Sequence, residues 1–173
     1  MIFASVGSIL PFDRLVRAVD EWAAANPGHD VFVQIGEGEY EPRHVPWARM
    51  MPHDEYRRRL VECSLFVAHV GMGSILQALE ERKQMLLLAR HNSLGEHTTD
   101  HQLHTAARFR DVPGLKIVDD AEHLKAEMSA LVHHPMKQSD GISPYASQEL
   151  IDNISDFLRP SRTKKTHLAL ASR

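Results

Sequence analysis

The apolar residues of this chain fall into two kinds of stretch that alternate along the sequence. Short, unbroken apolar runs rich in aliphatic residues are typical of strands buried on both faces of a sheet. Such runs lie at residues 1–6, 31–35, 64–70, 84–89 and 115–118, with a shorter candidate at 48–51. Between them, apolar residues three or four positions apart predict amphipathic helices. We expect these helices at residues 12–23, 54–62 with Asp54 as its cap, 73–82, 99–110, 120–132 and 147–158.

The alternation of strands and helices predicts the fold class. Strands that alternate with helices imply right-handed crossovers and a parallel sheet with helices on both faces, an α/β, Rossmann-like domain. In such sheets ligands bind beyond the carboxyl ends of the strands. We therefore expect one crevice to be formed by the loops that follow residues 6, 35, 51, 70 and 89.

The composition limits the classes of protein to consider. A chain of 173 residues is long enough for one well-cored domain, and a hydrophobic content of 43% is ordinary for a soluble globular protein. The net charge of -3 gives no reason to expect nucleic acid as a partner. Cys63 is the single cysteine, which excludes an internal disulfide and a thiolate zinc cluster. We interpret it as a core residue of a protein in a reducing compartment.

The ends of the chain lead to two further expectations. We predict one domain over residues 1–158, with the last helix packed back on it, and a disordered basic tail over residues 159–173, which carry no acidic residue. Residues 1–10 lack the basic leader of a signal peptide, and no apolar run is long enough to span a membrane. We therefore expect a cytoplasmic chain.

The apolar run at 64–70 leads into a glycine-rich loop, Gly71-Met72-Gly73-Ser74, at the start of the next helix. Glycine lets the backbone approach a ligand closely, and the free N–H groups that open a helix favour an anion such as phosphate. The loop lacks the third glycine of a dinucleotide fingerprint and the lysine of a P-loop. Because a loop that uses glycine only to turn and pack has the same residues, the motif alone leaves both interpretations open.

A wider set of motifs narrows this choice. His69 precedes the glycine loop, and one helix and one strand later the chain reads Gly-Glu-His-Thr-Thr-Asp-His-Gln over 95–102. Val-Gly-Ser at 6–8 is followed by Pro-Phe-Asp-Arg-Leu-Val at 11–16, and Val-Gln-Ile-Gly occupies 33–36. Across residues 1–110 these motifs resemble the donor-binding C-terminal half of the GT-B glycosyltransferases of family 28. Similar subunits occur in two-part bacterial exopolysaccharide and capsule glycosyltransferases and in the eukaryotic N-acetylglucosaminyltransferase of the dolichol pathway.

The resemblance implies a UDP-sugar as donor substrate and no additional cofactor. It places Gly71, Met72, Gly73 and Ser74 against the diphosphate of the donor. It also implies that His69 touches the donor or shapes the loop, whereas a lone histidine at a strand end is ordinarily structural.

Further positions match the family less completely. Gly7 and Ser8 correspond to a second loop near the donor phosphates, although a tight turn also explains them. Met51, in the loop 50–53, corresponds to the segment that cups the uracil base; the alternative is a core methionine. Gln77 stands where the family commonly places an acidic residue that binds both ribose hydroxyls, and its amide can accept from one hydroxyl and donate to the other.

The sugar itself is assigned to polar residues near the start of a later helix. Glu96, Asp100 and Gln102 match positions that hold sugar hydroxyls in the family, and Asp100 equally suits a helix cap. The histidines at 91, 97, 101 and 104 match no strong zinc signature, so we predict no metal. No residue of this chain stands out as the general base.

A GT-B enzyme needs two such domains, and this chain has the length of one. The resemblance therefore implies a membrane-associated partner subunit that binds a lipid-linked acceptor and holds this chain at the inner face of the membrane. We expect the catalytic, UDP-sugar-binding subunit of a two-subunit inverting glycosyltransferase, active with that partner, in exopolysaccharide or lipid-linked glycan synthesis. The alternatives are a noncatalytic nucleotide-sugar-binding or stabilising subunit and, against the short length, a nucleotide-sugar epimerase. Neither the sugar nor the acceptor can be read from the sequence.

Overall fold

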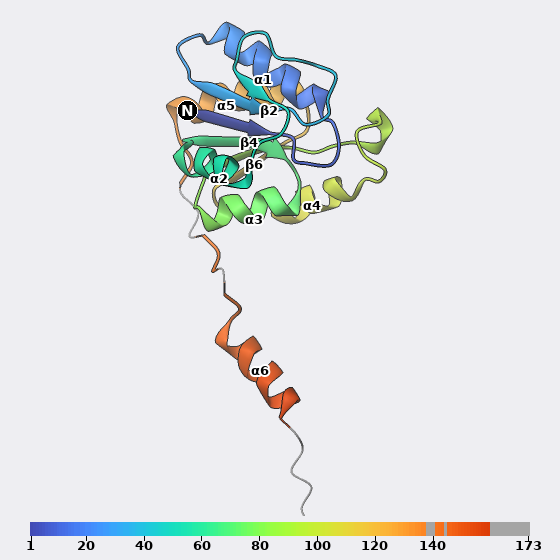
Figure 1. Cartoon of the computed structure of the whole chain (residues 1–173), viewed down its shortest axis with the longest axis vertical. Coiled ribbons are helices and arrows are strands. Elements are labelled where there is room, and N and C mark those ends of the chain that lie inside the picture. Colours follow the sequence, from blue (N-terminus) through green and yellow to red (C-terminus); the bar gives the residue numbers. More distant parts are fainter. Residues whose placement is uncertain (138–140, 144, 160–173) are drawn as a thin grey trace, which may run out of the picture. The chain divides into compact units, whose positions relative to one another are not determined.

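A six-stranded parallel sheet lies at the centre of the unit formed by residues 1–142 (Figure 1). The computed structural model describes residues 1–137, 141–143 and 145–159. Within these residues the strand order is β3-β2-β1-β4-β5-β6. The strands are β1 (Ile2–Ser5), β2 (Val31–Gln34), β3 (Trp47–Ala48), β4 (Leu65–His69), β5 (Met85–Leu88) and β6 (Leu115–Val118). This is the order of a doubly wound sheet, and it confirms the predicted α/β, Rossmann-like fold.

Helices cover both faces of the sheet. One face packs against α1 (Asp13–Ala25) and α5 (Ala121–His133), whose buried side chains share a cluster with the strands. The opposite face packs against α2 (His53–Glu62), α3 (Met72–Glu80) and α4 (His101–Phe109). A short 3-10 helix, η1 (Asn92–Leu94), lies in the connection from β5 to α4.

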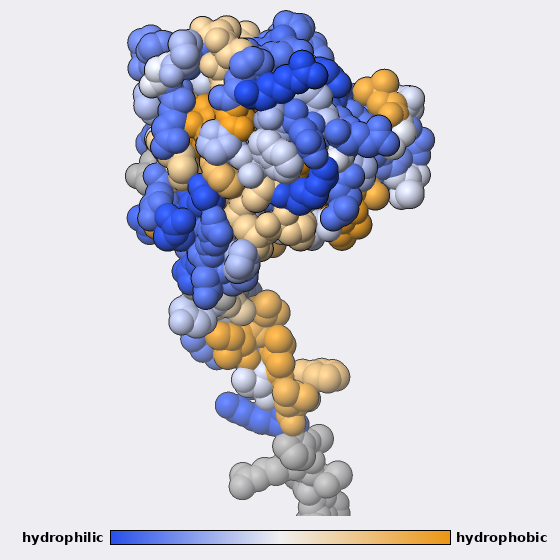
Figure 2. All heavy atoms as spheres, turned by 45° about the horizontal axis from the view of Figure 1, so that its top comes forward, coloured by the Kyte–Doolittle hydropathy of each residue, from blue (hydrophilic) through white to orange (hydrophobic). Residues whose placement is uncertain are grey.

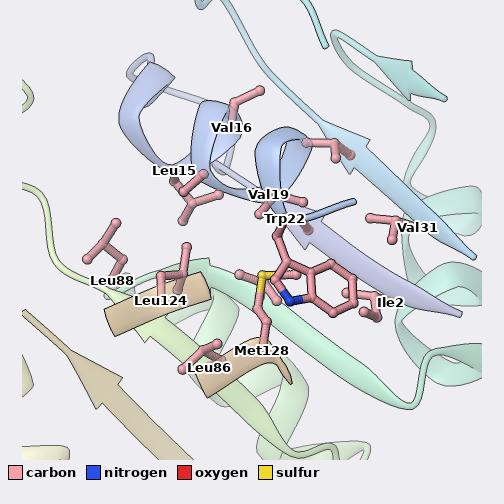
Figure 3. Packing of buried hydrophobic residues seen from close by; sticks show 14 of the residues in the cluster. Ile2, Leu15, Val16, Val19, Trp22, Val31, Leu86, Leu88, Leu124 and Met128 are labelled. Atoms are coloured by element: carbon pink, nitrogen blue, oxygen red, sulfur yellow. The ribbon is translucent and has the colours of Figure 1, made fainter. Parts of the chain in front are cut away.

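Each strand contributes alternate residues to the two cores, because successive side chains of a strand point to opposite faces. In β1, Ile2 and Ala4 join the α1 and α5 side, whereas Phe3 joins the opposite side. Trp22 of α1 packs near Met128 of α5 in the first core (Figure 3). This two-sided burial explains why the strands read as unbroken apolar runs.

The order of the strands marks the place where a ligand would bind. β1 pairs with β2 on one side and with β4 on the other, so the crossovers that leave β1 and β4 diverge to opposite sides of the sheet. Ligands of such sheets bind in the crevice outside the carboxyl ends of the strands at this switch point. The loops after Ser5 and His69 therefore border it.

Two sequence predictions about local structure are wrong. Asp54 does not cap α2, because the helix begins at His53 with Pro52 at the N-cap position and no side-chain cap. The weak strand expected at 48–51 is instead Trp47–Ala48. Its ladder with β2 joins Val33 to Trp47 and Gln34 to Ala48, which leaves the residues that follow free to form a loop.

A second unit begins at Ser143, and its described part is dominated by α6 (Gln148–Leu158). Ser147 caps this helix by accepting a hydrogen bond from the backbone N–H of Leu150 at 3.3 Å. Figure 2 shows a band of hydrophobic surface along it, formed by Leu150, Ile151, Ile154, Phe157 and Leu158. Packing of this helix on residues 1–142 stays a prediction, and beyond Arg159 the predicted basic tail lies outside the described residues.

Candidate functional site

A cleft of about 570 Å³ lies at the carboxyl ends of the strands, in the size range of pockets that bind small molecules. It is lined by loops after β1, β3, β4 and β5 and by residues of α2, α3 and α4. Most of the site residues predicted from the sequence line it, namely Gly7, Ser8, Met51, His69, Gly71, Met72, Gly73, Ser74, Gln77 and Gln102. The structure thus brings ten of the twelve predicted positions to one cleft.

The N-terminus of α3 opens into this cleft. Gly71 is the N-cap residue, and its carbonyl accepts the first helical hydrogen bond, from Ile75 at 3.0 Å. The N–H groups of Met72, Gly73 and Ser74 precede this bond, and no side chain of the described residues caps the helix. Unpaired N–H groups and the positive end of the helix dipole favour an anion at this position.

The glycines of the two loops differ in their surroundings. A Cβ added to Gly7, whose φ is +81°, would lie 2.6 Å from Cε1 of His69, and one added to Gly71 would lie 2.1 Å from its Nε2. The imidazole of His69 therefore occupies the space beside both glycines. A Cβ on Gly73 would meet nothing within 4 Å, so packing does not require glycine there.

His69 is neutral at physiological pH. Burial, together with the nearby positive charge of Arg90, lowers the pKa of the imidazole to about 4. Its Nδ1 is buried with no hydrogen-bond partner among the described residues. The side chain therefore shapes the two glycine loops without adding a charge to the cleft.

A buried polar network connects the loops from below. The hydroxyl of Ser5 donates to Oε1 of Gln34 at 2.7 Å and accepts from the backbone N–H of Gly7 at 3.1 Å. Nε2 of Gln34 donates to the carbonyls of Gly7 at 3.0 Å and Arg49 at 2.8 Å. The amide of Gln34 therefore connects the loop after β1 with the loop after β3. The second of these loops also contains Met51.

Tyr56 of α2 extends this network toward α3. Burial raises the pKa of its phenol, while hydrogen bonds with the side chains of Ser5 and Ser74 act in the opposite direction. The phenol thus lies close to the end of β1 and to the first turn of α3. Tyr56 was not considered from the sequence, and Gln34 was included only in the motif at 33–36, although each lines the cleft.

Two predicted sugar ligands do not line the cleft. The carboxylate of Glu96 forms a bidentate pair with Arg14, at 2.7 Å from Nε and 2.8 Å from Nη2. Asp100 stands at the N-cap position of α4 but does not cap the helix, and its Oδ1 accepts from the backbone N–H of Asn92 at 3.0 Å. The assignment of Glu96 and Asp100 to sugar hydroxyls stays a prediction.

The third predicted sugar ligand does reach the cleft, together with two histidines that were considered from the sequence only as metal ligands. Gln102 is buried, and its Oε1 accepts from the backbone N–H of Arg90 at 3.1 Å. His97 and His101 line the same end of the cleft, with ring centroids 4.3 Å apart. Their position after β5 is the available sequence signal, because residues after a parallel strand reach the same edge of the sheet.

Metal binding and membrane spanning can be assessed for the same part of the chain. The described residues contain no group of three or more His, Cys, Asp or Glu side chains that could hold a metal ion. None of the described helices is both long enough and apolar enough to cross a membrane.

Comparison with known proteins identifies the fold. No family model matches the sequence, and no curated protein matches it significantly. Among solved structures, ALG13 matches with a TM-score of 0.55 and 16% identity, over 88% of this chain and 93% of that chain. The glycotransferase of kitacinnamycin matches with a TM-score of 0.55 and 21% identity, and the spinosyn forosaminyltransferase SpnP with 0.51 and 16%.

These likenesses confirm the predicted fold of a GT-B half-domain. The last two matches cover 78% and 77% of this chain but 35% of each of those proteins, so the chain spans about a third of their length. At these identities the likeness concerns the fold.

Proposed function

We propose that this chain is the donor-binding catalytic subunit of a two-subunit inverting glycosyltransferase that uses a UDP-sugar. The observation that carries the proposal is the uncapped N-terminus of α3, which opens into the cleft between the loops after β1 and β4. A diphosphate matches this arrangement, because several N–H groups and a helix dipole can share its charge. The glycosyltransferase fold supports the same activity.

The proposed reaction is a single displacement at the anomeric carbon. The oxygen of the acceptor hydroxyl bonds to C1 of the sugar as the bond from C1 to the β-phosphate oxygen breaks, and the bonding electron pair leaves with UDP. The hydroxyl proton passes to a general base, which we assign to the partner subunit. N–H groups already aimed at the departing phosphate stabilise its growing charge more in the transition state than in the ground state.

The uracil, the ribose and the sugar of the donor can be assigned to residues that line the cleft. Met51 and the neighbouring loop line the part of the cleft proposed for uracil, and Gln77 of α3 lines the part proposed for ribose. Gln102 lines the end proposed for the sugar. Glu96 and Asp100 would reach sugar hydroxyls only after exchanging their present partners.

We further propose that the acceptor domain is supplied by a membrane-associated subunit that presents a lipid-linked acceptor. The match to ALG13 over nearly the whole length of both chains supports a half-domain as a unit in its own right. Recruitment by such a subunit would place this chain at the inner face of the membrane. Synthesis of an exopolysaccharide or lipid-linked glycan is the process proposed.

Gln77 is the observation that favours a second candidate, a noncatalytic subunit that binds a nucleotide sugar or stabilises its partner. A neutral amide replaces the expected carboxylate, and two further predicted ligands are engaged outside the cleft. Such a subunit would leave sugar transfer unchanged when its own donor site is blocked.

The test combines binding with transfer. Thermal unfolding is measured with UDP and with UDP-glucose, UDP-galactose, UDP-N-acetylglucosamine and UDP-glucuronate, because a ligand at a hundred times its Kd stabilises the fold by about 2.7 kcal/mol. Transfer from the best donor is then measured in membranes that contain the partner, with wild-type chain and with Gly73→Asp. The proposal predicts stabilisation by UDP and loss of transfer in the variant. Transfer that persists in the variant would favour the noncatalytic subunit. The absence of UDP binding would contradict the main proposal and leave only a subunit that stabilises its partner.

A further inference from the structure

Arg90 is a buried cation beside the cleft. It follows the carboxyl end of β5, and 3% of its surface is exposed. Its Nη2 donates to the carbonyl oxygens of Val6 at 2.7 Å and Leu10 at 2.5 Å, and its Cζ lies 5.0 Å from the ring centroid of Phe12. These contacts fix the guanidinium against the loop that follows β1.

No carboxylate among the described residues is paired with Arg90 alone. Its Nε is buried with no hydrogen-bond partner among the described residues. The acidic side chain that acts on it electrostatically is Glu96, whose two oxygens already accept from Arg14 at 2.7 and 2.8 Å. None of the described residues that line the cleft is Asp or Glu. A buried charge without a paired counter-ion lowers stability, and groups perturbed in this way cluster at functional sites.

Arg90 stays charged while the nearby His69 is neutral. Burial lowers the pKa of the guanidinium to about 10, which still leaves it protonated at neutral pH. His69 is neutral under the same conditions, since burial and the charge of Arg90 lower its pKa to about 4. Arg90 is therefore the fixed positive side chain among the described residues that line the cleft.

Gln102 binds the backbone of Arg90. The amide of Gln102 is 2% exposed, and its Oε1 accepts from the backbone N–H of Arg90 at 3.1 Å. This contact joins the first turn of α4 to the end of β5. The glutamine predicted to hold a sugar hydroxyl is thus already bound to the backbone of Arg90.

We propose that Arg90 is the residue that neutralises the diphosphate of the donor, with Gln102 as its positioning residue. This inference rests on the proposed function. It assigns to Arg90 the full positive charge that the N–H groups of α3 do not supply to the diphosphate. Arg90 and the start of α3 border the same cleft, so a diphosphate between them would contact a full positive charge and a helix dipole together. Uridine, which carries no phosphate, would gain nothing from Arg90.

The test compares the affinities for uridine and UDP. Two variants distinguish an effect of the charge of Arg90 from an effect on the shape of the cleft. Arg90→Gln removes the cation, while Gln102→Glu keeps an acceptor for the backbone N–H of Arg90 and adds a carboxylate near it. Calorimetric titration should show UDP binding weakened about tenfold or more in each variant, because a charge-assisted contact is lost or neutralised. Uridine affinity should not change, and the UDP affinity of the variants should depend less on salt than that of the wild type. Arg90→Lys, which keeps the charge, should lose less than Arg90→Gln.

Several outcomes would overturn the inference. Equal losses for uridine and UDP in both variants would mean that Arg90 acts only on the shape of the cleft. Urea unfolding shows whether Arg90→Gln folds. If it does not, the test rests on Gln102→Glu, and unchanged UDP binding in that variant contradicts the proposal. If the wild type binds no UDP, the proposed function fails and inorganic pyrophosphate becomes the probe. Pyrophosphate binding that depends on Arg90 would then support the anion site, and its absence would overturn it.

Discussion

The hydroxyl of Ser5 donates to Oε1 of Gln34 at 2.7 Å, in a bond between two side chains buried beneath the cleft. Because Nε2 of the same glutamine donates to the carbonyls of Gly7 and Arg49, one amide connects the ends of β1 and β2 with the loop after β3. The positions of the two loops proposed to hold phosphate and base therefore depend on Gln34. Its role is positioning, beneath the ligand.

Gln34→Leu should lower both stability and UDP affinity. The leucine leaves two carbonyls and the hydroxyl of Ser5 without their partner, and such losses cost about 1–3 kcal/mol. Urea unfolding measures the first effect and calorimetric titration with UDP the second. Gln84→Leu is the matched control, because Gln84 precedes β5 at the opposite end of the strand and bonds to Ser64 and Met136. A wild-type UDP affinity in Gln34→Leu would show that the network does not position the loops.

Gly71→Ala should destabilise the fold through its contact with His69. The new methyl group would lie 2.1 Å from Nε2 of the imidazole, and overpacking of this kind costs about 1–3 kcal/mol. The double variant Gly71→Ala/His69→Ala should recover part of that loss, because it removes the ring that the methyl group meets. Gly73→Ala, which meets nothing within 4 Å, is the control and should not be destabilised. Additive effects of the two substitutions at 71 and 69 would contradict the contact.

The neutral His69 predicts a specific pH dependence of stability. Its pKa is about 4 in the folded chain, lowered by burial and by Arg90, against an ordinary value of 6.5. The unfolded chain therefore binds more protons between these pH values, so the stability contributed by His69 is complete above pH 6.5 and falls as the pH drops toward 4. The change amounts to about 3 kcal/mol. Urea unfolding at several pH values should show that His69→Gln lacks this component, and parallel curves for variant and wild type would contradict the assignment.

Gln77 determines how ribose would be bound. Gln77→Glu should raise affinity for UDP relative to 2′-deoxy-UDP by about fivefold, since a carboxylate accepts from hydroxyl groups more strongly than a neutral amide. Competition titration of the two nucleotides measures this ratio. Glu80→Gln, a change on the same helix at an exposed position outside the main cleft, should leave the ratio unaltered. An unchanged ratio in Gln77→Glu would place ribose away from Gln77.

The sequence predicted the fold well because the sheet is buried on both faces. Apolar runs and helical spacing are local patterns, and they located the strands and helices of the described residues except the short η1 and the two-residue β3, which was expected at 48–51. The error at 48–51 arose because Met50 and Met51 are apolar but belong to a loop that borders the cleft. The misplaced cap at Asp54 arose because Pro52 also suits the start of a helix.

The candidate site was less predictable, because its polar partners are distant in the sequence. The glycine loops lie next to the strands that position them, so local motifs found them. The pair of Arg14 and Glu96 joins residues 82 positions apart, and nothing near Glu96 indicates that its carboxylate is already engaged. Arg90 was not predicted as a site residue for the same reason. A basic residue directly after an apolar strand of a parallel sheet is nevertheless a sequence signal for a side chain at the ligand-binding edge.

The central claim is that the N-terminus of α3 binds the diphosphate of UDP, and one comparison of affinities tests it most directly. Gly73→Asp places a carboxylate in open space at the first turn of α3, where it should stabilise the helix but repel a diphosphate. Gly28→Asp adds the same charge at another glycine whose surroundings are open, in the turn after α1. Calorimetric titration with UDP should show binding to the wild type and to Gly28→Asp, and a loss of about tenfold or more in Gly73→Asp. Equal UDP affinity in all three proteins, or no binding to the wild type, would contradict the account.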